Sequence, residues 1–149
     1  VLRDVPFETF LAKLPECRRQ CGDRAVLRAF HIYADNDRVA KQVAALREGD
    51  FSTFLRLVSE SGHSSWEYLQ NVIPAGYKEH QEMGVTIAAA KHYLNGKGAV
   101  RVHGGGFAGT AQAFVPVEML ADFKKNMEAI LGEGRCHVLS IRPEGGAVL

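Results

Sequence analysis

The sequence has few cysteines, no long apolar run and almost no excess of charge. Its 149 residues include three cysteines, an odd number that argues against a disulfide framework. No apolar run approaches the ~18 residues that a membrane span needs, so none is expected. Lysine and arginine total 18 and aspartate and glutamate 17, and a net charge of +1 gives no bulk attraction to nucleic acid or to an anionic membrane.

No secretory signal is visible in residues 1–15. Residues 1–15 carry four charged side chains and contain no apolar segment of the kind that a signal peptide has. We therefore expect a cytoplasmic protein with reduced thiols. Cys17 and Cys21 have no second pair nearby, and no histidines stand at metal-ligand spacing, so no metal site is expected. Because the chain starts at Val1, we expect it to be cut from something longer.

The composition indicates one globular domain over residues 1–149. Hydrophobic residues make up 46% and charged residues 23%, which excludes a disordered chain. The first two thirds have apolar residues at helical spacing. Expected boundaries are Pro15, Gly49 with Asp50 as the next cap, and an interruption at Ser61–Ser65. The expected helices cover residues 6–14, 24–47, 51–58, 66–72 and 83–94.

After residue 98 the apolar period changes from helical to alternating. The pattern predicts strands at 99–103, 110–115 and 137–142, a helix between Pro116 and Gly132, and a last strand at 147–149. Their short connections suit an antiparallel sheet. The expected fold class is therefore α+β, with helices packed on one face of a small antiparallel sheet.

The most specific feature is the loop between the first two strands, His103–Thr110, with four glycines in six positions. Glycine weakens regular structure, so the loop needs positive φ angles, close approach of another group, or both. Successive backbone N–H groups in such a loop can bind an anion, typically a nucleotide phosphate. A strand follows the loop, whereas a dinucleotide-binding loop opens a helix. The alternative is a glycine-rich turn that only permits tight packing.

Residues 101–110 resemble the third conserved motif of galactokinases, members of the GHMP small-molecule kinase superfamily. The family's string commonly reads Arg-Met-Thr-Gly-Ala/Gly-Gly-Phe-Gly-Gly-Cys, and the chain departs from it at Val102, His103, Ala108 and Thr110. Further stretches that resemble family motifs are 28–39, 46–50, 59–65 and 142–147. The family's sugar-binding signature and its Gly-Leu-Ser-Ser-Ser loop for ATP are absent.

This resemblance implies the C-terminal domain of a galactokinase-like enzyme, a ferredoxin-like sandwich that docks on its own N-terminal domain. The implied reaction transfers the γ-phosphoryl group of ATP to a monosaccharide, with galactose the leading candidate and Mg²⁺ as cofactor. The N-terminal domain, absent from this chain, would bind ATP, Mg²⁺ and sugar and supply the catalytic residues. The chain alone is therefore expected to be inactive.

The resemblance also implies which residues lie near the substrate: Gly104, Gly105, Gly106, Phe107 and Gly109. The glycines would bring backbone close to a phosphate, and Phe107 would anchor the loop by packing. His103 could hydrogen-bond a phosphate or a sugar hydroxyl, and His63 could line the cleft. The structural alternatives are a histidine at a strand end and a helix–helix junction, respectively.

Two other functions stay open. One is a non-catalytic small-molecule binding or regulatory module, because fold does not determine function. The other is a galactokinase paralogue that acts on another sugar or as a sensor. The departures at His103, Ala108 and Thr110 keep this last possibility open.

Overall fold

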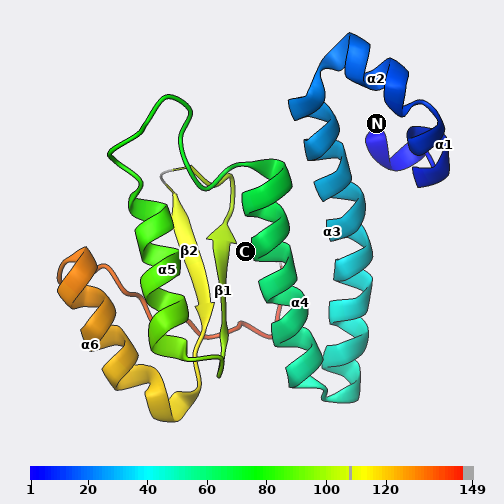
Figure 1. Ribbon diagram of the computed structural model, residues 1–149. Helices are drawn as coiled ribbons and strands as arrows, with labels where there is room; N and C mark the ends of the chain where they lie inside the picture. The colour runs from blue at the N-terminus through cyan, green and yellow to red at the C-terminus, as the bar shows by residue number, and fades with distance from the viewer. Residues whose placement is uncertain (108, 146–149) are drawn as a thin grey trace.

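The computed structural model describes residues 1–107 and 109–145 of the chain. It has the expected α+β fold, with helices packed against an antiparallel sheet (Figure 1). None of the described helices is both long enough and apolar enough to span a bilayer. The elements are η1 (Leu2–Asp4), α1 (Phe7–Ala12), α2 (Leu14–Cys21), α3 (Asp23–Glu48), α4 (Phe51–Ser64), the π-helical turn η2 (Ser65–Leu69), α5 (Glu82–Leu94), β1 (Ala99–His103), β2 (Thr110–Phe114), η3 (Val117–Met119) and α6 (Leu120–Leu131).

The sheet is an antiparallel pair, β1 with β2, in which Val100 lies opposite Ala113 and Val102 opposite Ala111. Both strands agree with the prediction. Val100 and Val102 are almost fully buried and join the main apolar cluster with residues of α5 and α6. Thr110, Gln112 and Ala113 of β2 are exposed. Among the described residues β2 has no second strand partner, so its outer side is an open sheet edge.

The boundary between α3 and α4 lies at Gly49 and Asp50, as predicted. Gly49 adopts a left-handed conformation with φ of 72°, which ends α3. The side chain of Asp50 then accepts a hydrogen bond of 3.0 Å from the backbone N–H of Thr53, which caps α4.

Pro15 does not end a helix, which corrects the prediction. It lies in the first turn of α2, where a backbone N–H would have no acceptor within the helix, so proline costs no hydrogen bond there. The preceding helix α1 has already ended at Ala12. Phe7 and Phe10 of α1 pack on Phe30 and Tyr33 of α3, with ring centroids 5.1–6.0 Å apart, so the first helix is held by an aromatic cluster of its own.

The predicted interruption at Ser61–Ser65 is also wrong, because α4 continues to Ser64 and passes directly into η2. Ser61, Ser64 and Ser65 are buried rather than exposed. Gly62 lies against β1, where an added Cβ would stand 3.1 Å from the Cβ of Arg101. Small side chains at this point therefore allow α4 to approach the strand closely.

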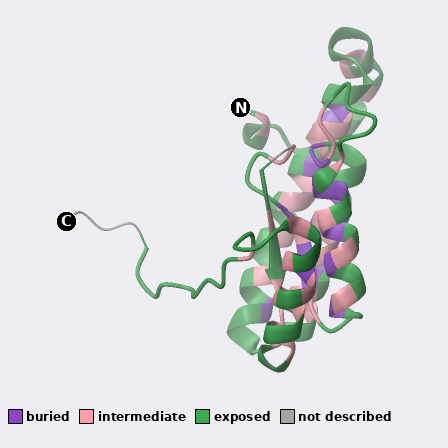
Figure 2. Ribbon diagram, turned by 90° about the vertical axis from the view of Figure 1, so that its left-hand side faces the viewer, coloured by how far each residue is buried: buried purple, intermediate pink, exposed green. Residues whose placement is uncertain are grey.

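The predicted strand over 137–142 does not form. Leu139 and Ile141 are 85% and 92% exposed, and the segment runs away from the body of the molecule (Figure 2). Alternating apolar residues favour an extended backbone, but a strand also needs a neighbour to pair with. The last predicted strand, 147–149, lies outside the described residues.

Candidate functional site

The glycine-rich loop connects β1 to β2 at one end of the sheet (Figure 1). Gly104 and Gly106 have positive φ angles of 65° and 81°, which confirms that the loop needs glycine for its conformation. Phe107 also has a positive φ, 61°. Ala108, one of the departures from the family motif, lies outside the described residues. The N–H of Gly109 donates to the carbonyl oxygen of Gly106 at 3.2 Å, which closes the turn.

Gly106 packs directly against Asn71, a residue from the connection that follows η2. A Cβ on Gly106 would stand 2.7 Å from Cγ of Asn71 and would also overlap its backbone oxygen. The backbone N–H of Phe107 donates to that oxygen, and Nδ2 of Asn71 donates to the carbonyl of Gly105 at 3.4 Å. Glycine is therefore required at position 106 because Asn71, a residue of the same chain, approaches its backbone closely.

Gly105 differs from its neighbours in the loop. It does not have a positive φ, and an added Cβ would meet no atom within 4 Å. Gly104 likewise faces open space, but its positive φ already favours glycine. Within the described part of the chain, Gly105 therefore has neither a conformational nor a steric reason to lack a side chain.

The backbone of the loop offers hydrogen-bond donors in sequence. The amides of Gly104 and Gly105 have no backbone acceptor among the loop hydrogen bonds of residues 1–107 and 109–145. The N–H of Gly106 follows the turn at Gly104–Gly105, which directs it back across the turn. Successive backbone amides in a turn can form a concave site for an anion without a mobile side chain. In contrast, no three His, Cys, Asp or Glu side chains of the described residues come together as metal ligands.

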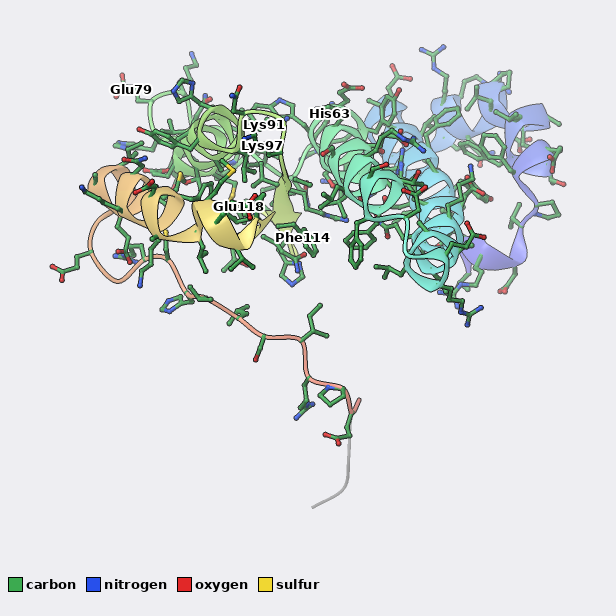
Figure 3. The ribbon with its side chains drawn as sticks, turned by 90° about the horizontal axis from the view of Figure 1, so that it is seen from below. His63, Glu79, Lys91, Lys97, Phe114 and Glu118 are labelled. Carbon is green, nitrogen blue, oxygen red and sulfur yellow. The ribbon has the colours of Figure 1, made fainter. Side chains whose placement is uncertain are left out.

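The two candidate histidines lie in different places. His103 is exposed at the end of β1, next to the loop. His63 lies on α4, where Nζ of Lys91 on α5 stands 3.0 Å from its Nε2 (Figure 3). The two side chains border a small pocket of about 90 Å³ with Trp66 and Arg101. His63 thus has a partner at the junction of two helices, and the structure gives it no hydrogen bond to the loop among the described residues.

Comparison with known proteins gives matches to galactokinases. The chain is 32% identical over 124 residues to a galactokinase of Mannheimia succiniciproducens, 31% to that of Glaesserella parasuis and 30% to that of Actinobacillus pleuropneumoniae. Each match covers 83% of the chain. The chain is galactokinase-like. It spans 30% of the length of these relatives, and no protein-family model matches it.

Two of the other stretches that resemble galactokinase motifs, 28–39 and 59–65, meet in a buried polar network that sequence analysis did not predict. Ser61 of α4, 1% exposed, donates to Oδ1 of Asp35 on α3 at 2.6 Å and accepts from Nη1 of Arg101 on β1 at 2.6 Å. Asp35 also accepts from Arg38 at 2.9 Å. The hydroxyl of Ser61 on α4 therefore links the carboxylate of Asp35 on α3 to the guanidinium of Arg101 on β1.

His31 extends this network. It is 3% exposed, and its Nδ1 lies 2.9 Å from Oγ of Ser64, while Nε2 lies 3.6 Å from Oδ2 of Asp35. Burial lowers the pKa of His31, and the guanidinium groups of Arg38 and Arg101 lower it further, against the opposing effect of Asp35. The galactokinase-like residues at 28–39 and 59–65 therefore hold α3, α4 and β1 together, and β1 leads into the glycine-rich loop.

Proposed function

We propose that residues 1–149 are the C-terminal domain of an ATP-dependent sugar kinase of the galactokinase type. The similarity to galactokinases supports a sugar-kinase domain. The observation that carries the proposal further is Gly105, for which the described residues give neither a positive φ nor a steric contact as a reason to be glycine, and which lies beside the available amide of Gly104.

The reaction would transfer the γ-phosphoryl group of ATP to a hydroxyl of a monosaccharide, at the anomeric carbon if the sugar is galactose. Phosphoryl transfer depends mainly on positioning and on stabilisation of negative charge. The amides of Gly104 and Gly105 suit the second task because fixed backbone donors need no reorganisation during the reaction. Gly109 closes the turn that presents them, and His103 stands beside them with a side chain able to hydrogen-bond a phosphate or a sugar hydroxyl.

ATP, sugar and Mg²⁺ would be held mainly by an N-terminal domain. The loop would receive a phosphate on its backbone amides, whereas the described residues offer no cluster of carboxylates for Mg²⁺. A row of part-exposed apolar side chains leaves a surface that a further domain could cover: Ile32, Val39, Val43 and Leu46 on α3, with Phe51 beside them. The three cysteines are unpaired, which fits the cytoplasm as the place of action.

The substitution Gly105→Ala in the full-length protein tests the proposal. The added methyl group meets nothing in the fold, so the melting temperature should stay unchanged. If a phosphate approaches the loop, we expect kcat/KM for sugar phosphorylation to fall at least about tenfold, equivalent to about 1.4 kcal/mol of transition-state stabilisation. Gly145→Ala is the matched control, because a Cβ there also meets no atom within 4 Å.

The assay measures ATP consumption against a panel of monosaccharides. Full activity of the Gly105→Ala variant would show that no ligand approaches this glycine. Sugar binding without ATP consumption by the wild-type protein would favour the non-catalytic binding module instead. Activity of the wild-type protein on a sugar other than galactose would identify it as a galactokinase paralogue.

A further inference from the structure

Asn71 joins the glycine-rich loop to the helical part of the fold. Gln70, just before it, adopts a left-handed conformation with φ of 57° and ends the π-helical turn η2. The chain therefore turns at this point, and Asn71 lies 4% exposed against the loop. Since η2 continues directly from α4 and packs on α3, the loop is attached through Asn71 to two long helices.

Three contacts from one residue fix three consecutive positions of the loop. The backbone oxygen of Asn71 accepts from the N–H of Phe107, and its Nδ2 donates to the carbonyl of Gly105. Between them, the side chain of Asn71 fills the space where Gly106 would carry a Cβ. The amide must present Nδ2 rather than Oδ1 to Gly105, because two facing oxygens would repel each other.

The hydrogen bond to Gly105 also determines where the next N–H points. The peptide bond between Gly105 and Gly106 is trans and planar, so its carbonyl and its N–H point in opposite directions. When Asn71 holds the carbonyl inward, the N–H of Gly106 turns away from Asn71. That N–H points back across the turn at Gly104–Gly105, so the same peptide fixes the turn whose Gly104 and Gly105 amides are proposed to meet a phosphate.

We infer that Asn71 is a positioning residue that holds the Gly105–Gly106 peptide, and with it the turn whose Gly104 and Gly105 amides face the phosphoryl group. This inference rests on the proposed sugar kinase function. Asn71 does not touch the substrate in this arrangement. It acts through the peptide whose carbonyl it holds.

The isosteric substitution Asn71→Asp provides a pH-dependent test in the full-length protein. At neutral pH a carboxylate replaces the donor and repels the carbonyl of Gly105. We expect kcat to fall about 10- to 100-fold, by analogy with the loss of a transition-state donor, with a smaller change in KM. Burial raises the pKa of the introduced carboxyl group, and its protonated form can donate to Gly105 again. The activity relative to wild type should therefore recover as the pH falls.

The variant Asn71→Ala lacks this donor at every pH, so its kcat should be reduced at neutral pH and should not recover as the pH falls. Gln81→Ala is the matched control. It also removes an amide donor to a backbone carbonyl, that of Lys78 at 3.1 Å, in the same connection but away from the loop. We expect the control to keep wild-type kcat. Equal kcat for wild type, Asn71→Ala and Asn71→Asp at neutral pH would overturn the inference, as would equal pH profiles of the two variants.

Amide hydrogen exchange separates this inference from the proposed function, because it needs no activity. We expect faster exchange at Phe107 and Gly109 in Asn71→Ala than in wild type and in Gln81→Ala. Unchanged exchange would overturn the role of Asn71 whatever the enzyme does. Faster exchange in a protein that phosphorylates no sugar would support Asn71 as the residue that holds the loop, while it refutes the proposed kinase.

Discussion

Ser61→Ala removes the hydroxyl at the centre of the buried network, and its cost can be worked out from the contacts. The hydroxyl makes two hydrogen bonds of 2.6 Å to charged partners, Asp35 and Arg101. Each such bond contributes roughly 1.5–3 kcal/mol. We expect the lower end, because Asp35 keeps its bond to Arg38 and Arg101 keeps its bond to the carbonyl of Val102. The expected loss in the free energy of unfolding is about 3 kcal/mol.

Thermal and urea unfolding measure this loss. For a chain of this size, about 3 kcal/mol corresponds to a fall of roughly 6–12 °C in melting temperature. Ser52→Ala is the matched control, since it makes the same change on the same helix. Its exposed hydroxyl lies 3.1 Å from Asp50, and its loss should cost no more than about 0.5 kcal/mol. Equal unfolding midpoints for the two variants would refute the view that the network holds α3, α4 and β1 together.

Two further predictions concern the same region of the fold. The pKa of His31 is lowered in the folded state, so the unfolded chain binds the proton more tightly. The free energy of unfolding should therefore fall as the pH drops below about 6.5, and His31→Gln should make that dependence shallower in urea unfolding at pH 7.5 and 5.5. Gly98→Ala would place a Cβ 2.8 Å from Cδ2 of Leu94 and against the carbonyl of Phe114. We expect it to cost about 1–3 kcal/mol in thermal unfolding, and unchanged stability would contradict the packing of β1 on β2.

Local signals explain which parts of the fold the sequence predicts. Gly49 and Asp50 act within their own turn, so the α3–α4 boundary follows from neighbouring residues alone. At Ser61–Ser65 the same reasoning fails, because serines there are buried by partners from α3 and β1 that lie far away in the chain. The alternation at 137–142 is equally local, and it cannot supply the neighbouring strand that a sheet requires.

The candidate site shows the same difference between features set by neighbouring residues and features set by distant partners. Four closely spaced glycines mark the loop, and the positive φ angles at Gly104 and Gly106 follow from residue type. The partner of Gly106 could not be read from the sequence, because Asn71 is a single amide 35 positions earlier with no motif around it that points to the loop. The roles of His103 and Gly105 stay predictions, since both depend on a ligand.

The open side of β2 has a consequence for the behaviour of this chain in solution. Its five residues, Thr110–Phe114, include no lysine, no proline and no bulge, which are the devices that keep exposed sheet edges from joining. Backbone groups along such a border accept any extended polypeptide of suitable length, whatever its side chains. Molecules of this chain are therefore expected to associate strand to strand as their concentration rises, unless a further domain covers this edge of the sheet.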